Sequence, residues 1–129
     1  FTFDAEDCPD LVPIASVLGA YAKGKTVIKN IERLRLKESD RVQSTMAMLS
    51  SFGIRSETDG KDLIVYGGTA CAGVVDGFND HRIVMSASVM ASAIEQTTKI
   101  IGAQAVNKSY PTFFEHFNLL GGNACEEKR

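Results

Sequence analysis

The sequence predicts a mixed α/β (α+β) domain in which one structural unit occurs twice, with helix N-termini facing one side and small mixed sheets packed against them. Two helices, opened by Asp10 and by Asp80, are apolar on nearly all sides, which is typical of helices packed between layers. A β-branched segment follows each helix, and a lysine then precedes an amphipathic helix. The intervals from Asp10 to Lys37 and from Asp80 to Lys108 are 27 and 28 residues. Such similarity indicates a repeated supersecondary unit.

The first unit covers about residues 1–66. Its buried helix runs from Pro9-Asp10 to about Ala22, and Pro13 falls in the first turn, where a missing N–H costs little. The other predicted elements are a strand at 26–28, an amphipathic helix that Ser39 caps and Gly53 ends, and a hairpin of 54–58 and 63–66 across Asp59-Gly60. The first four residues resemble the inside of a strand, so we expect the chain to be part of a longer protein.

The second unit covers about residues 67–122. We expect a short strand at 73–78, a buried helix from Asn79-Asp80 to about Ile94, and a strand at 98–101. Gly102 marks a bend. The last helix is expected to have Pro111 at its first position and to end at Gly121.

The bulk composition is that of an ordinary globular protein, with 44% hydrophobic and 23% charged residues among 129. A net charge of −2 argues against a general nucleic-acid binder. The three cysteines lack metal-ligand spacing and indicate free thiols in a reducing compartment. No apolar run reaches membrane-spanning length and no signal peptide is visible. We therefore expect a cytoplasmic protein.

Cations stand at helix starts, where the helix dipole disfavours them. Lys37 with Arg41 precedes or opens the second helix, His81 with Arg82 opens the third, and Lys108 precedes the fourth. Helix N–H groups together with such side chains form anion-binding sites, so a cleft for a ligand with several anionic groups is expected. Asp10 and Glu38 stand among these cations and are candidates for proton transfer. Each stretch alone is also compatible with a capped, solvated helix start carrying ordinary surface charges.

The two histidines receive different interpretations. His81 is either a hydrogen-bonding group at a helix end or a substrate contact, and its position alone does not separate the two. His116 lies on an amphipathic face among phenylalanines and is interpreted as structural. Ser39 has no paired histidine, so a serine nucleophile is not expected.

Three motifs together resemble one enzyme family. They are Leu34-Arg35-Leu36-Lys37-Glu38-Ser39-Asp40-Arg41, Asn79-Asp80-His81-Arg82 and Asn107-Lys108-Ser109-Tyr110-Pro111. Their order and spacing resemble the C-terminal part of the 5-enolpyruvylshikimate-3-phosphate (EPSP) synthase family. The resemblance covers essentially the whole chain but a minor part of the family's length. It implies repeated β/α units of the enolpyruvyl transferase type, of which residues 1–129 would form a partial C-terminal domain with two pseudo-repeats.

The resemblance implies transfer of the enolpyruvyl group of phosphoenolpyruvate to the 5-hydroxyl of shikimate 3-phosphate, with release of phosphate, in aromatic amino acid biosynthesis. It also implies no metal or organic cofactor, a monomer without nucleic-acid or membrane partners, and inhibition by glyphosate. The family's N-terminal domain supplies the other wall of the cleft. We therefore expect the isolated chain to lack activity.

The resemblance also assigns roles to matched residues. Asp10 corresponds to the carboxylate that binds shikimate 3-phosphate and accepts the hydroxyl proton. Lys37 corresponds to a lysine between the two substrates, and Glu38 to the proton donor for the phosphoenolpyruvate methylene. The remaining matched residues correspond to the phosphoenolpyruvate ligands and a neighbour: Arg41, Arg82 and Lys108, with His81 beside them.

Two alternatives remain. A UDP-N-acetylglucosamine enolpyruvyl transferase shares the repeated fold, but it carries different residues where this chain has Lys37 to Arg41 and Asn79 to Arg82. A non-catalytic anion-binding module could reuse the same fold, because fold does not determine function.

Overall fold

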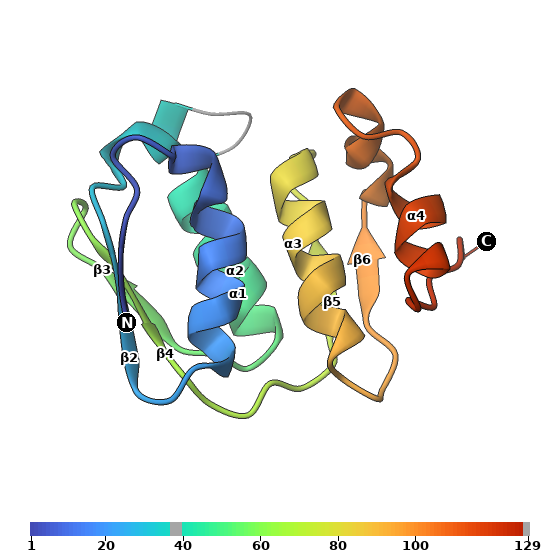
Figure 1. The fold of residues 1–129 in the computed structure, drawn as a ribbon, viewed down its shortest axis with the longest axis horizontal. Coiled ribbons are helices and arrows are strands. Elements are labelled where there is room, and N and C mark those ends of the chain that lie inside the picture. Colours follow the sequence, from blue (N-terminus) through green and yellow to red (C-terminus); the bar gives the residue numbers. More distant parts are fainter. Residues whose placement is uncertain (37–39, 128–129) are drawn as a thin grey trace.

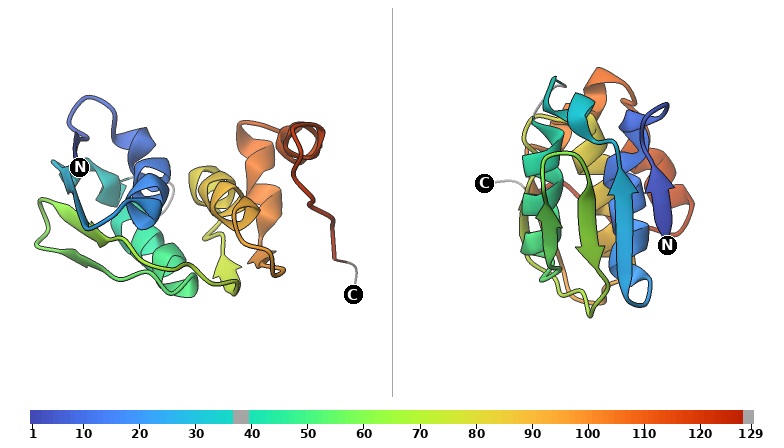
Figure 2. Two further views of the ribbon diagram at one scale, coloured as in Figure 1. Left: turned by 60° about the horizontal axis from the view of Figure 1, so that its bottom comes forward. Right: turned by 90° about the vertical axis from the view of Figure 1, so that its left-hand side faces the viewer.

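Two small β-sheets, one in each half of the chain, organise the computed structural model, which describes residues 1–36 and 40–127 (Figure 1). The strands of the first sheet lie in the order β1 (Thr2–Asp4), β2 (Lys25–Lys29), β4 (Leu63–Tyr66) and β3 (Ser56–Thr58). The second sheet pairs β5 (Val74–Asp76) with β6 (Lys99–Ile101). Figure 2 shows the four-stranded sheet with α1 and α2 covering one of its faces.

Each half contains a parallel strand pair joined by a helix. Strand β1 pairs with β2 around α1 (Val12–Tyr21), which a 3₁₀ turn, η1 (Pro9–Leu11), precedes. Strand β5 pairs with β6 around α3 (His81–Ser92). A 3₁₀ helix and an α-helix follow each pair, namely η2 (Glu32–Leu36) with α2 (Arg41–Ser51) and η3 (Ala103–Lys108) with α4 (Phe113–Leu119). The expected mixed α/β architecture is confirmed.

The predicted hairpin is also present, because β3 and β4 pair antiparallel with Glu57 opposite Ile64. Asp59 closes its turn by accepting from the backbone N–H groups of Lys61 and Asp62, each at 2.9 Å. Side-chain capping of this kind explains why Asp-Gly predicts a tight connection.

Helices α1, α2 and α3 all begin at the upper end of the molecule in Figure 1. They pack on one another, and a single apolar core joins the two halves. The core residues come from both sheets and all three helices, and they include Val12, Ile28, Met48, Leu49, Phe52, Leu63, Val75, Ile83 and Met90. Shared packing of this kind fixes the helix starts relative to one another.

Three expected helix boundaries differ from the structure. Asp40, not Ser39, is the N-cap of α2, because its extended backbone lets Oδ1 accept from the Gln43 N–H at 3.3 Å. Ser39 lies outside the described residues. Asp10 lies in η1, one residue before the N-cap of α1.

The last helix also starts later than predicted. Pro111 precedes the N-cap residue, Thr112, instead of occupying the first helical position. Gly102 adopts a left-handed φ of 75° and turns the chain straight into η3, so Lys108 lies at the end of a 3₁₀ helix. The four-residue spacing of aromatics in α4 packs Phe113 against Phe117, and no residue of this short helix is buried. None of the described helices is long and apolar enough to cross a membrane.

Candidate functional site

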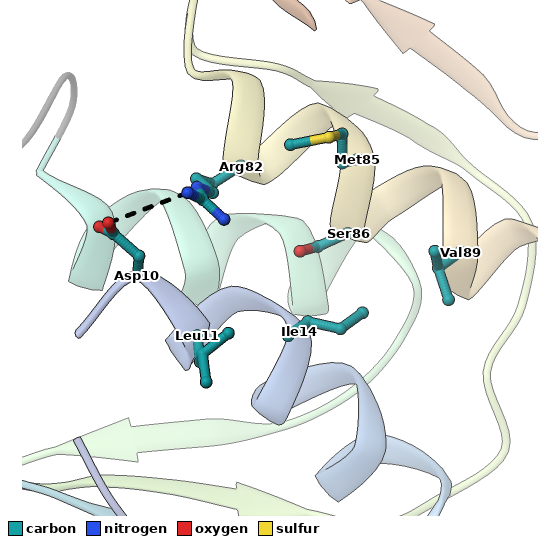
Figure 3. Close-up of a pocket in the computed structure, with 7 residues that line it drawn as sticks. All are labelled: Asp10, Leu11, Ile14, Arg82, Met85, Ser86 and Val89. Carbon is teal, nitrogen blue, oxygen red and sulfur yellow. Dashed lines mark ion pairs between the residues drawn. The ribbon is translucent and has the colours of Figure 1, made fainter. Parts of the chain in front are cut away.

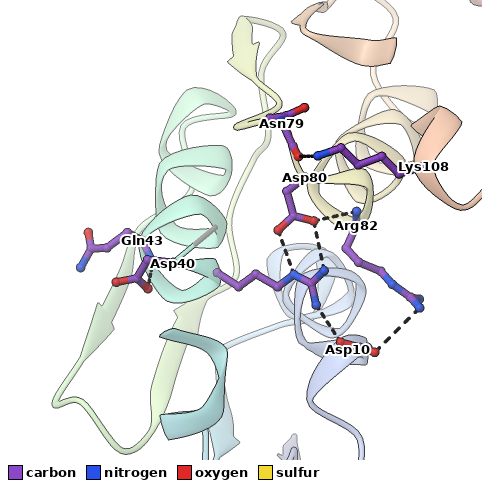
Figure 4. Close-up of polar contacts among 8 residues, drawn as sticks. Asp10, Asp40, Gln43, Asn79, Asp80, Arg82 and Lys108 are labelled. Carbon is purple, nitrogen blue, oxygen red and sulfur yellow. Dashed lines mark hydrogen bonds and ion pairs between the residues drawn. The ribbon is translucent and has the colours of Figure 1, made fainter. Parts of the chain in front are cut away.

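The starts of α1, α2 and α3 meet at a cluster of charged side chains (Figure 4). Arg41 is the first residue of α2, and its side chain is only 2% exposed. Asp80, the N-cap of α3, is fully buried. A charge removed from water is costly unless it is paired, so the buried Arg41 and Asp80 each need a partner of opposite charge.

Arg41 and Asp80 form a forked ion pair. The Arg41 Nε donates to Asp80 Oδ2 at 2.9 Å, and Nη2 donates to Oδ1 at 3.2 Å. The planar guanidinium suits a carboxylate in this two-point geometry. Asp80 Oδ1 also accepts the backbone N–H of Arg82 at 3.0 Å. One carboxylate therefore caps α3 and holds the first side chain of α2.

Asp10 extends the network toward solvent. The Arg41 Nη1 donates to Asp10 Oδ1 at 2.7 Å, and Arg82 Nη2 lies 3.9 Å from Asp10 Oδ2. The side chains of Asp10 and Arg82 are 48% and 39% exposed. Charges thus alternate from the buried Asp80 through Arg41 and Asp10 to Arg82, and the solvent-facing end offers a carboxylate between two guanidinium groups.

A tight turn delivers Asp80 to this cluster. Phe78 and Asn79 both have φ near 53°, as the central residues of a type I′ turn do, and the Asp80 N–H donates to Gly77 O at 2.9 Å. A left-handed phenylalanine is unusual and indicates local strain. Two contacts hold the turn: Asp76 Oδ1 accepts the Phe78 N–H at 2.8 Å, and the Lys108 Nζ donates to Asn79 O at 2.5 Å.

Two nitrogens at the start of α3 are shielded from solvent without a partner among the described residues. They are Nδ1 of His81 and Nε of Arg82. Buried polar atoms in proteins nearly always have a hydrogen-bond partner, so each such atom at a site needs an explanation. A ligand with oxygen atoms at the start of α3 would supply one.

A shallow pocket of about 190 Å³ lies between α1 and α3 beside the charged cluster (Figure 3). Asp10 and Arg82 stand at one end. Apolar side chains line most of the remainder, which comprises Leu11, Ile14, Met85, Ser86 and Val89. The pocket therefore combines a charged end with an apolar wall.

The structure brings together most of the residues that the sequence singled out. Asp10 and Arg41 contact each other, Arg82 adjoins Asp10, and Lys108 contacts Asn79, which precedes Asp80 and the predicted neighbour His81. Lys37 and Glu38 lie outside the described residues. His116 Nδ1 forms a hydrogen bond of 2.7 Å with the Tyr110 hydroxyl, away from this cluster, in agreement with a structural role.

Sequence reasoning missed the role of Asp80 and the burial of Arg41. Asp80 opens α3 as predicted and caps it, but its pairing with Arg41 joins positions 39 residues apart. No local pattern indicates that contact. The alternative of a solvated surface charge is wrong for Arg41, because its side chain is buried and pairs with the buried Asp80 and the half-exposed Asp10.

Comparison with known proteins identifies the family. A family model for EPSP synthase (3-phosphoshikimate 1-carboxyvinyltransferase) matches residues 2–117. The chain is 46% identical, over 124 residues, to the 3-phosphoshikimate 1-carboxyvinyltransferase of Clostridium novyi, covering 94% of this chain and 28% of that protein. The chain thus spans less than a third of this relative's length.

Solved structures agree with the sequence comparison. An EPSP synthase from Acinetobacter baumannii matches with a TM-score of 0.83 and 31% identity, over 89% of this chain and 28% of that one. The enolpyruvyl transferase NikO from Streptomyces tendae matches with a TM-score of 0.75 and 23% identity, over 95% and 28%, and this likeness concerns the fold alone. The family match over most of its length shows that the chain belongs to the EPSP synthase family.

Proposed function

We propose that the full-length protein containing this chain transfers the enolpyruvyl group of phosphoenolpyruvate to the 5-hydroxyl of shikimate 3-phosphate. The chain forms part of its C-terminal domain, as two pseudo-repeats at about 1–66 and 67–122. Paired details at the ends of the parallel strands support the repeat. Asp4 and Asp76 each accept an N–H two residues on, and Asn30 and Gly102 are both left-handed.

The reaction needs one proton acceptor and one proton donor. The 5-hydroxyl oxygen bonds to the central carbon of phosphoenolpyruvate, the hydroxyl proton leaves to a base, and the methylene carbon gains a proton. The resulting tetrahedral intermediate then loses phosphate as its methyl group returns a proton, which restores the enol double bond. A positioned carboxylate and a positioned acid together serve such chemistry.

The position of Asp10 between Arg41 and Arg82 is the single observation that carries the proposal. The carboxylate lies 2.7 Å from the Arg41 Nη1 and 3.9 Å from the Arg82 Nη2, where it can contact a substrate hydroxyl held beside the two guanidinium groups. The same groups attract substrates that carry several negative charges. Asp10 is therefore proposed as the base and hydroxyl ligand. Lys37 and Glu38, outside the described residues, retain their proposed roles as the lysine between substrates and the methylene proton donor.

The start of α3 is proposed to bind phosphoenolpyruvate. Arg82 presents a partly exposed guanidinium there, and Arg41, whose Nη1 donates to the neighbouring Asp10, is proposed as a second ligand of phosphoenolpyruvate. The unpartnered nitrogens of His81 and Arg82 support a ligand at this position. Lys108, attached to the turn before α3, adds a third cation. The opposite wall of the cleft comes from the N-terminal domain of the same protein.

A phosphate-release assay on the full-length protein tests the proposal. Phosphate should appear only when phosphoenolpyruvate and shikimate 3-phosphate are both present, and Asp10→Asn should lower kcat about 10²–10⁴-fold, the contribution typical of a general base. Asp59→Asn removes an exposed carboxylate from the distant hairpin and is the matched control. Equal phosphate release with UDP-N-acetylglucosamine as acceptor, or wild-type kcat in Asp10→Asn, would contradict the proposal.

A further inference from the structure

We propose that Asp80 is a positioning residue that orients Arg41 toward Asp10. This inference rests on the proposed function, which makes Arg41 a phosphoenolpyruvate ligand and Asp10 the base. Asp80 itself is fully buried at the N-cap of α3. It acts through Arg41, whose guanidinium it contacts with both carboxylate oxygens.

Helix capping does not explain a carboxylate at this position. The cap requires one oxygen, and Asp80 Oδ1 accepts the Arg82 N–H at 3.0 Å. Asparagine and serine cap helices about as well as aspartate, without bringing a charge into the interior. The second oxygen, Oδ2, accepts the Arg41 Nε at 2.9 Å. The feature that only a carboxylate provides is therefore the fork onto Arg41.

Stability does not explain the ion pair either. Burying a carboxylate and a guanidinium removes both from water, and the Coulombic attraction often does no more than offset that loss. The fork does fix the plane of the guanidinium, because Nε and Nη2 are both held by one rigid carboxylate. Nη1 then points to Asp10 Oδ1 at 2.7 Å. Asp80 thus sets the direction of Arg41 and, through it, the position of Asp10.

The turn that carries Asp80 is tied to the same site. Phe78 and Asn79 are held in left-handed conformations, which persist only where surrounding contacts impose them. One such contact is the Lys108 ammonium on Asn79 O. Asp80, in the second half, therefore contacts Arg41 of the first half from a turn that Lys108 holds in place. Lys108 is itself one of the residues proposed to bind phosphoenolpyruvate. This arrangement joins both halves at the reacting end of the cleft.

Two substitutions separate positioning from capping in the full-length protein. Asp80→Asn and Asp80→Ser both keep an oxygen for the Arg82 N–H, but neither can fork onto Arg41. We expect the KM for phosphoenolpyruvate to rise about 10- to 100-fold in either variant, the range typical of a lost hydrogen bond to a charged group. Asp59→Asn is the matched control and should keep the wild-type KM. A changed melting temperature with wild-type KM in both Asp80 variants would overturn the inference.

A double substitution tests whether Asp80 acts through Arg41. In an Arg41→Lys background the fork is already lost, so adding Asp80→Asn should change KM by less than about threefold. A further tenfold rise would mean that the two residues act independently, and the inference would fail.

A spectroscopic measurement does not depend on activity or on a stable variant. In the wild-type protein the Arg41 Nε–H should give a narrow NMR signal that exchanges slowly with solvent, unlike that of Arg55, whose side chain is 71% exposed. Exchange as fast as that of Arg55 would overturn the orientation by Asp80. Absence of phosphate release from the wild-type protein would instead contradict the proposed function, and the Nε–H signal would still decide the role of Asp80.

Discussion

At the scale of single residues, burial separates Arg41 from Arg82. Both are arginines at the first turn of a helix, and both adjoin Asp10. Arg41 is enclosed and, among the described residues, contacts the carboxylates of Asp10 and Asp80, whereas the Arg82 side chain is 39% exposed. A charge inside the protein depends on its partners, while an exposed charge is stabilised by water. We therefore expect substitution of Arg41 to lower stability as well as binding, and substitution of Arg82 to affect binding alone.

Removal of the Arg41 side-chain charge should destabilise the protein. Arg41→Met leaves the buried Asp80 carboxylate without its guanidinium partner, which typically costs about 3–5 kcal/mol of unfolding free energy. Urea denaturation followed by circular dichroism measures this change. Combining Arg41→Met with Asp80→Ser removes the stranded charge and should recover part of the loss. Equal stability of Arg41→Met and wild type would show that the ion pair does not form.

Substitution of Arg82 should affect binding instead of stability. Arg82→Lys keeps the charge but loses the planar fork, so we expect the KM for phosphoenolpyruvate to rise roughly tenfold in the full-length enzyme. The melting temperature should stay near that of wild type, because the side chain is partly exposed. Steady-state kinetics measures the change. Arg55→Lys, an exposed arginine on the hairpin, is the control, and an unchanged KM in both variants would remove Arg82 from the site.

We expect the contribution of Asp59 to the stability of the hairpin to be lost in acid. Backbone N–H groups of Asp62 and Lys61 lower the pKa of the Asp59 carboxyl below its ordinary value in the folded protein. Its stabilisation is therefore complete above the unfolded pKa and is lost as the pH falls through the folded pKa. Unfolding measured at pH 6 and near pH 3 should show a smaller acid loss in Asp59→Asn than in wild type. The same acid loss in both proteins would contradict this assignment.

At the scale of elements, close backbone contact joins the segment that follows β4 to the connection between α1 and β2. Two glycines follow β4, and the first of them, Gly67, donates its N–H to Gly24 O at 2.8 Å. A Cβ atom on Gly67 would lie 1.8 Å from the carbonyl oxygen of Ala22. Backbone cannot yield as a flexible side chain does. The close approach of Gly67 to residues 22–24 thus depends on the absence of a side chain at Gly67.

A matched pair of substitutions tests this close backbone approach. Gly67→Ala should lower the unfolding free energy by about 1–3 kcal/mol or more, because the added methyl forces the backbone apart. Gly68→Ala is the control, since its Cβ would meet nothing nearer than Ile54 Cδ1 at 3.8 Å. Denaturant unfolding compares the two variants. Equal stability of both would show that the segments around Ala22 and Gly67 are farther apart than described.

At the scale of the whole molecule, α1, α2 and α3 begin at the same end (Figure 1), and the charged cluster of Asp10, Arg41, Asp80 and Arg82 lies at their starts. The chain spans 28% of the length of the Clostridium novyi relative. The proposed cleft between two domains would need donors from both walls to orient two substrates, and this chain supplies one of those walls.

The isolated chain should therefore turn over negligibly. Correct placement of two reactants is worth roughly 7–11 kcal/mol of barrier in favourable cases, and half a cleft forgoes most of it. We expect residues 1–129 to release no measurable phosphate from phosphoenolpyruvate and shikimate 3-phosphate, while the full-length protein does so in the same assay. Circular dichroism of the fragment checks that it is folded. Phosphate release by the folded fragment would show that one wall suffices.

Local physical chemistry explains why much of this fold could be predicted from sequence. Stretches that are apolar on nearly all sides indicated α1 and α3, and Asp59-Gly60 indicated the hairpin, because each depends on residues close along the chain. The helix boundaries differed from the prediction: the cap of α2 is Asp40 instead of Ser39, and Lys108 lies at the end of η3. Those shifts depend on backbone angles, such as the left-handed Gly102, that sequence does not specify alone.

The sequence by itself determined the fold class, and it predicted the repeated unit and the residue types of the proposed anion site. It also placed Asp10, Arg41 and Arg82 at helix starts. Only the tertiary structure decided that Arg41 is buried and that Asp80 holds it, because positions 39 residues apart meet when α1, α2 and α3 pack around one core. A charge can be enclosed only where partners from other segments surround it, and which segments meet is a property of the packed chain.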